Sequence, residues 1–207
     1  MIRSLSIIVV LMICAAAVAG QSIYGSTDVK TFREGRDRDF RNKDLSPLLA
    51  ADFETFKGLE YFEIDPRFAV DATLERTTEE QIFMMPTSIG QSRKYFKYGI
   101  LRFEIDGTWH QLTVFRSAAA PTKEEYAGLL FIPFRDLTNG KETYGAGRYM
   151  DLRTPTENKV KIDFNLAYNM SCAYGSDKYS CAVPPRENFL QIKVTAGEKS
   201  YAHAVQK

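Results

Sequence analysis

Two alternating runs joined by an Asp-Gly pair constrain the fold of this chain more than any other feature. Within Tyr98 to Arg116, the run GILRFEI leads into Asp106-Gly107, and TWHQLTVF follows. Asp-Gly readily adopts the positive φ angles that a two-residue hairpin turn requires, and alternating side chains suit strands with one buried face. The stretch therefore predicts an antiparallel β-hairpin.

Other segments extend this pattern. Residues 128–134 (GLLFIPF) form a nearly continuous apolar run, which is typical of a buried central strand. Shorter strands are predicted at 68–74, 80–85, 160–165 and 189–194, with Pro86 ending the second of these. Leu48 to Phe62 is rich in aromatic residues and is expected to plug one edge of the core.

One helix is predicted before the strands. Thr27 or Asp28 can cap it, and it runs to about Arg41, with Val29, Phe32 and Phe40 as its apolar positions among many charged ones. A stripe this thin indicates a solvated helix held on the core by its aromatic residues. The fold class is therefore mainly β, either an antiparallel β-sandwich or a partly closed barrel, with an N-terminal helix.

The first twenty residues have a different character from the rest. Arg3 precedes an apolar run from Leu5 to Val18, and small residues follow, so residues 1–20 are expected to be a secretory signal peptide cleaved near Ala19 or Gly20. The run is short for a membrane span, and no transmembrane segment is expected after cleavage. The mature protein is then periplasmic or secreted. It comprises an N-terminal extension at 21–55, a β-rich domain at 56–199 and a tail at 200–207, with fraying expected after Gly197.

Two cysteines remain after the signal. Cys14 leaves with it, and Cys172 and Cys181 bracket a polar loop in an oxidising compartment, which favours a disulfide over a reduced structural pair, a reactive thiol or a metal pair. Because the chain has only two histidines, His110 and His203, and no C-x-x-C, we expect no metal site and no cofactor.

The charge balance restricts the partners. The chain has 27 basic and 26 acidic residues, and removing the signal removes Arg3 alone, leaving equal numbers. A neutral protein is a poor match for nucleic acid, which requires a positive surface. The sequence also lacks a phosphate-binding loop, a dinucleotide fingerprint and a G-x-S-x-G elbow, which argues against the enzyme classes they mark. Nothing in the sequence indicates an oligomeric state.

Two polar stretches carry a specific set of motifs. These are D-x-T-x-G-x-E-T-Y and G-R-Y within 131–152, and D-F-N-x-A-Y-N and P-P-x-E-N within 162–199. With FKGLEYFEIDPRFAVDAT at 56–73, they resemble the domain-of-unknown-function family 1684, and the resemblance covers Phe56 to Lys199. It implies a bacterial protein of a family without an assigned activity, and so supplies no mechanism.

The same stretches provide the candidate site. They contribute polar side chains that could line a pocket at one mouth of the barrel: Arg148, Tyr149, Asp163, Asn165, Asn169, Glu187 and Asn188. In the first hypothesis Arg148 clamps an anion, and Asn165 and Asn169 orient a small polar or carbohydrate-like ligand. The protein would then be an exported binding or accessory module.

Two alternatives stay open. Asp163 and Glu187 could act as acid and base of a hydrolase, with Arg148 as an electrostatic stabiliser. The cluster could instead be purely structural, with Arg148 pairing with Asp163 or Glu187 to hold two loops together and Asp136 serving as a turn residue. The absence of familiar catalytic motifs favours binding over catalysis.

Overall fold

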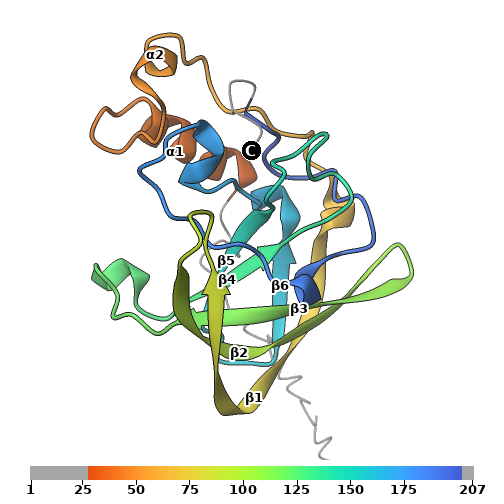
Figure 1. Ribbon diagram of the computed structural model, residues 1–207. Coiled ribbons are helices and arrows are strands. Elements are labelled where there is room, and N and C mark those ends of the chain that lie inside the picture. Colours follow the sequence, from red (N-terminus) through yellow and green to blue (C-terminus); the bar gives the residue numbers. More distant parts are fainter. Residues whose placement is uncertain (1–27, 202–207) are drawn as a thin grey trace, which may run out of the picture.

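The computed structural model describes residues 28–201, which form one curled antiparallel sheet with helical segments at one end (Figure 1). The expected signal peptide at 1–20 lies outside the described residues. The sheet has six strands in the order β5-β4-β3-β2-β1-β6. Their bounds are β1 Ala69–Pro86, β2 Ser92–Ile105, β3 Thr108–Ser117, β4 Leu129–Phe134, β5 Arg148–Arg153 and β6 Lys159–Asp163. The mainly β prediction is confirmed, in the form of a single open barrel-like sheet.

The predicted hairpin joins β2 to β3. Ile105 pairs with Thr108, and the turn residues Asp106 and Gly107 have φ angles of 49° and 77°. Positive φ at both central positions is the geometry that matches strand twist in a two-residue hairpin. The Asp-Gly prediction is therefore confirmed.

The strands predicted at 68–74 and 80–85 are two arms of one long strand, β1. Its register against β2 shifts between Arg76 and Gln81, and Figure 1 shows β1 bending sharply there. A Cβ at Gly99, opposite the bend on β2, would lie 2.6 Å from the carbonyl oxygen of Glu75. Only glycine permits this close approach of the two backbones, which lets the sheet curl.

The strand predicted at 189–194 is absent, and this prediction is wrong. The backbone of this segment bonds instead to the loop after β4: Leu190 N–H donates to Arg135 O, and Leu137 N–H donates to Ile192 O. Leu190 and Val194 are buried as the alternation predicted. The side-chain pattern thus identified the buried face, but the backbone partner is a loop outside the sheet.

The strand predicted at 160–165 ends early. β6 stops at Asp163, and a 3-10 turn, η3, occupies Phe164–Leu166. The Asp163 carboxylate accepts a hydrogen bond from Asn165 N–H at 2.8 Å and so caps the turn. Asp163 and Asn165 therefore do not lie together on one face of a strand.

Helix α1 (Val29–Phe40) begins after Asp28, whose side chain accepts from Lys30 N–H, so the predicted capped helix is confirmed. It packs with the short helix α2 (Ala50–Phe53) over a small cluster that contains Phe40, Leu48 and Tyr174. The remaining 3-10 turns are η1 Pro66–Phe68, η2 Glu124–Tyr126, η4 Ser171–Tyr174 and η5 Arg186–Asn188. From residue 28 to residue 201, no helix is long and apolar enough to span a membrane. The main core lies inside the curl of the sheet.

Candidate functional site

Arg148, the predicted anion clamp, is completely buried and ties β5 to the C-terminal segment. Its guanidinium donates to the Asp136 carboxylate at 2.9 Å, to Val194 O at 2.7 Å, and to Ala196 O. Asp136 also accepts from Thr138 N–H and from Val194 N–H. Arg148 thus holds two loops together, as the structural alternative foresaw, but its charged partner is Asp136.

The side-chain amides of two predicted site residues form hydrogen bonds with backbone groups, in the way that a neighbouring strand would. Asn188 is fully buried and exchanges hydrogen bonds with both the N–H and the C=O of Thr113, at 2.7 and 2.8 Å, while also donating to Pro133 O. Asn165 does the same with Asp65, at 3.0 and 2.9 Å. Each amide joins chain segments that the sheet ladder does not reach. Both are therefore bonded within the protein.

The remaining predicted residues are also engaged locally. Tyr149 stacks on Phe131 with ring centroids 5.4 Å apart, and its hydroxyl donates to Ala182 O. Glu187 is exposed and pairs with Lys97 at 2.9 Å. Asp163 caps η3, as described above. The bonds that the structure gives Arg148 in the described chain go to neither Asp163 nor Glu187.

Asn169 is the exception, because it belongs to a network around Glu198. The Glu198 carboxylate accepts from Asn169 N–H and Asn169 Nδ2, both at 3.1 Å, from Arg36 of α1 at 3.1 Å, and from the Tyr174 hydroxyl. Glu198 is only 1% exposed. The prediction that the chain frays after Gly197 is therefore wrong for residues 198–201, since Glu198 anchors them.

Arg36 and Tyr174 both stay protonated in this network. Burial alone would lower the pKa of Arg36, but the adjacent Glu198 carboxylate outweighs this and raises it. Burial raises the pKa of the Tyr174 hydroxyl, and Glu198 raises it further, so Tyr174 remains a proton donor. Arg36 also lies over the Tyr168 ring, 5.0 Å from its centroid. Glu198 thus joins α1, the chain after η3, and the C-terminal segment.

An open cavity of about 570 Å³ adjoins this network. It lies between α1, the chain around Leu45 and Pro47, the start of β2 and the segment 168–181. The polar side chains on its walls are Arg36, Asp39, Arg93, Tyr168, Asn169, Ser171, Tyr174, Lys178, Tyr179 and Ser180. Its volume falls in the range of small-molecule sites.

Three buried polar atoms of the residues that line the cavity are without hydrogen-bond partners. The first is Asn169 Oδ1, since the amide nitrogen of Asn169 makes all the side-chain bonds, to Glu198 and to Lys199 O. The others are the Ser180 hydroxyl and Arg36 Nε. Asn169 is only 1% exposed. Buried polar groups are nearly always paired, so such atoms beside a cavity mark positions where a bound molecule could bond.

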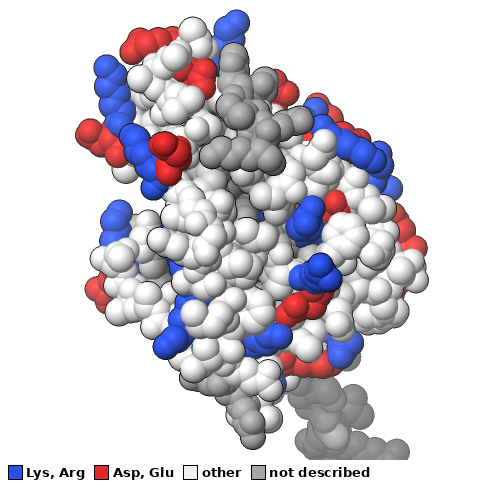
Figure 2. Space-filling model, in the orientation of Figure 1, with Lys and Arg blue, Asp and Glu red and all other residues white. Residues whose placement is uncertain are grey.

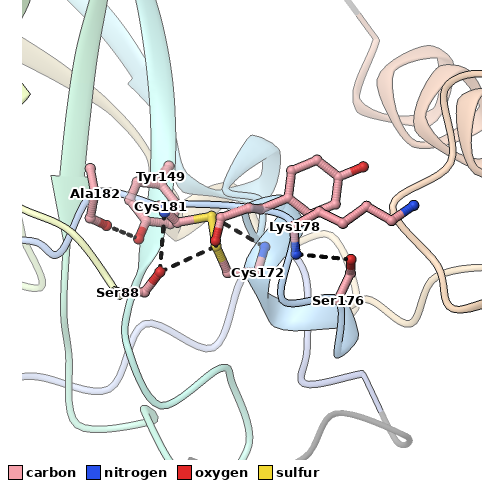
Figure 3. The surroundings of a disulfide bond; sticks show 8 residues. Ser88, Tyr149, Cys172, Ser176, Lys178, Cys181 and Ala182 are labelled. Carbon is pink, nitrogen blue, oxygen red and sulfur yellow. Dashed lines mark hydrogen bonds between the residues drawn. A yellow bond between two sulfur atoms is a disulfide. The ribbon is translucent and has the colours of Figure 1, made fainter. Parts of the chain in front are cut away.

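The predicted disulfide builds one wall of the cavity. Cys172 and Cys181 are bonded, and Ser88 braces the bridge by accepting from Cys181 N–H at 3.2 Å. Figure 3 shows the Lys178 side chain extending away from the disulfide, toward the N-terminal helical segment. The disulfide prediction is confirmed, and its loop brings Lys178 and Ser180 to the cavity.

Sequence reasoning missed Arg36 and Glu198. A signal for Arg36 was present, because Phe32, Arg36 and Phe40 follow one another at four-residue spacing and so lie on the same face of α1. An arginine inside the apolar stripe of a helix requires a buried partner. For Glu198 no local signal exists, since its partners lie at positions 36, 169 and 174.

The described side chains do not form a candidate metal site. Between residues 28 and 201, no group of three or more His, Cys, Asp or Glu side chains is arranged to hold one.

Comparison with known proteins places the chain in a family. The family described as "Protein of unknown function (DUF1684)" matches residues 54–199. Among solved structures, the chain is similar to the solution NMR structure of the uncharacterized protein from gene locus rrnAC0354 of Haloarcula marismortui. The two are 36% identical with a TM-score of 0.67, over 86% of this chain and 95% of that one. No curated protein matches the chain significantly. The chain therefore belongs to the DUF1684 family of proteins of unknown function.

Proposed function

We propose that this protein is a non-catalytic binding module that takes a small polar ligand in the cavity between α1 and the disulfide loop. The observation that carries the proposal is the unpartnered Oδ1 atom of Asn169, a nearly fully buried residue on the cavity wall. Leaving a buried acceptor without a partner costs about 1–3 kcal/mol. A ligand that donates an O–H or N–H to this atom would recover that free energy.

The rest of the wall suits such a ligand. Ser180 provides a second polar atom without a partner, and Tyr168 and Tyr179 provide partly apolar rings with polar ends. Arg36 and Glu198 hold Asn169 in place through charge-assisted hydrogen bonds. A rigid wall lowers the entropy that must be lost on binding.

Hydrolysis has less support. Asp163 is occupied as the cap of η3, and Glu187 is paired with Lys97 at the surface. Neither residue belongs to the walls of the cavity. This leaves the cavity without the pair of carboxylates that the hydrolase hypothesis required.

The proposal also places the mature protein outside the cytoplasm, either in the periplasm or secreted. The supporting observations are the signal-like residues 1–20 and the disulfide, which persists in oxidising compartments. Protein isolated from its host should begin near residue 20 or 21 and should show no free thiol without reduction. Labelling of Cys172 and Cys181 under native conditions would contradict this part of the proposal.

The test of binding is a thermal-shift screen of residues 21–207 against sugars, sugar acids, hydroxycarboxylic acids, amino acids, peptides and nucleotides. A true ligand should raise the midpoint with concentration, because a molecule that binds only the folded state stabilises it by about 2.7 kcal/mol at one hundred times its Kd.

Ser180→Ala is the informative variant, since it removes an unpartnered hydroxyl from the wall and should leave stability unchanged while weakening the shift. Tyr98→Phe is the matched control, because it removes an unpartnered buried hydroxyl from a residue outside the cavity walls. If no compound in the screen shifts the midpoint of the folded protein, the proposal is overturned and the cavity has only a structural role.

A further inference from the structure

The charges at the cavity indicate a class of ligand. Its walls contain three basic residues, Arg36, Arg93 and Lys178, and a single acidic residue, Asp39. This bias is local, because the chain as a whole is close to neutral and Figure 2 shows basic and acidic side chains interspersed over one face. A local excess of positive charge favours an anionic group on the ligand.

The three basic residues are not equivalent. Arg36 is 20% exposed and is neutralised by Glu198 at 3.1 Å, so its charge is used within the protein. Arg93 and Lys178 are exposed at the rim, one at the start of β2 and the other on the disulfide loop. Asp39 is also exposed and can offset only one of them. The positive charge open to a ligand therefore lies at the rim.

The inner wall is electrically balanced. The Arg36 guanidinium there lies 3.1 Å from the Glu198 carboxylate, and two buried atoms are without partners, the acceptor Asn169 Oδ1 and the donor Arg36 Nε. An uncharged hydroxyl group can donate to the first or accept from the second. The positive charge that is not neutralised therefore lies at the rim, and the unpartnered polar atoms lie at the inner wall.

We infer that the ligand is a small polyhydroxylated carboxylate, such as a uronic or aldonic acid. Its carboxylate would face Arg93 and Lys178, and a hydroxyl group would donate to Asn169 Oδ1. The volume of about 570 Å³ is ample for a molecule of this size. This inference rests on the proposed function and specifies its ligand class and its orientation.

Isothermal titration of residues 21–207 with matched pairs of acid and neutral sugar tests the inference. The pairs are galacturonate with galactose and glucuronate with glucose, and gluconate is added as an open-chain acid. We expect each acid to bind about two- to thirtyfold more tightly than its neutral partner, because its carboxylate forms ion pairs with two exposed basic side chains. The preference should shrink as NaCl rises from 50 to 500 mM.

The double variant Arg93→Gln with Lys178→Gln should bring the ratio of acid to neutral affinity to about one and leave the affinity for neutral sugar unchanged. Lys159→Gln with Lys161→Gln is the matched control, because it removes the same charge from exposed positions on β6, outside the cavity walls. It should keep the preference for the acid.

The outcomes separate the two hypotheses. Equal affinity for acids and neutral sugars overturns the inference and leaves the proposed function standing. The same conclusion follows if all acids fail to bind and a ligand from another class binds in the screen. A preference for acids that survives in the double variant overturns the orientation with the carboxylate at the rim. Failure of every compound in the screen overturns the proposed function and the inference together.

Discussion

Arg148 and Asp136 form an ion pair in which neither side chain has exposed surface. Removing two charges from water is costly, and their attraction offsets that cost only when both ions are fully hydrogen-bonded. Burial lowers the pKa of the Arg148 guanidinium, and Asp136 opposes this shift. Thr138, Val194 and Ala196 add further hydrogen bonds to the pair, which makes it a fixed part of the fold.

Asp136→Ala should therefore lower the free energy of unfolding by about 3–5 kcal/mol, because it leaves the Arg148 charge buried and unpaired. Urea denaturation measures this change. The matched control is Glu75→Ala, which removes the partner of Arg102 from an exposed pair and should cost less than about 1 kcal/mol. Similar losses in both variants would contradict a special role for the buried pair.

For single residues, the sequence predicted which polar residues are important more reliably than it predicted their hydrogen-bond partners. It identified Arg148, Asn165 and Asn188 as important polar residues, and all three are buried or nearly so. Their partners are Asp136, Asp65 and Thr113, up to 100 positions away. Such pairings depend on how the sheet curls, which no short stretch of sequence encodes.

Among the elements, the segment 194–198 packs closely against the chain around η3 although it lies outside the sheet. Gly197 has a φ of 77°, and a Cβ there would lie 2.7 Å from the carbonyl oxygens of both Phe164 and Ala167. Gly90 has the same φ of 77°, and a Cβ there would meet open space. The two glycines share a backbone conformation and differ in their surroundings.

Gly197→Ala should consequently destabilise the protein by clearly more than Gly90→Ala. Both variants bear the cost of a left-handed conformation, about 1–2 kcal/mol. Only the first also forces two backbone segments apart, adding on the order of 1–3 kcal/mol. Thermal or urea unfolding of the two variants isolates this packing contribution. Equal destabilisation would show that the contact at Gly197 relaxes without cost.

Elements whose signal is local were predicted well, and those that depend on a distant partner were not. The β2–β3 hairpin and α1 are specified by their own turn and cap residues. Residues 189–194 alternate like a strand, yet they bond to the loop at 135–137. Alternation predicts which side chains are buried. It does not predict which backbone segment forms hydrogen bonds with this one.

For the whole molecule, Asp151 couples stability to pH. This half-buried residue on β5 accepts a hydrogen bond from Tyr168 at 3.0 Å. Burial raises the pKa of Asp151 to about 6, although the Tyr168 bond and Arg36 act in the opposite direction. Unfolded aspartate titrates near 3.9. The folded protein therefore holds this proton more tightly than the unfolded chain does, so its stabilising effect is present at low pH and is lost as pH rises through about 6.

Asp151→Asn should remove that loss, because an asparagine oxygen can still accept the Tyr168 bond without carrying a charge. At pH 7 the variant should be more stable than the parent protein by about 1–3 kcal/mol, and the difference should vanish near pH 4. Urea denaturation between pH 4 and 7.5 measures both curves. Asp71→Asn, at an exposed position on β1, is the control and should change little. Parallel curves for Asp151→Asn and the parent would refute the coupling.

The network around Glu198 has a consequence for what must be present for this protein to fold. The family match covers residues 54–199, whereas the partner that neutralises Glu198 is Arg36, in a helix upstream of that range. A fragment limited to residues 54–199 would keep the buried Glu198 carboxylate and lose the Arg36 cation. Removing one partner of a buried ion pair strongly lowers the free energy of unfolding. The autonomous folding unit is thus longer at its N-terminal side than residues 54–199, and α1 belongs to it.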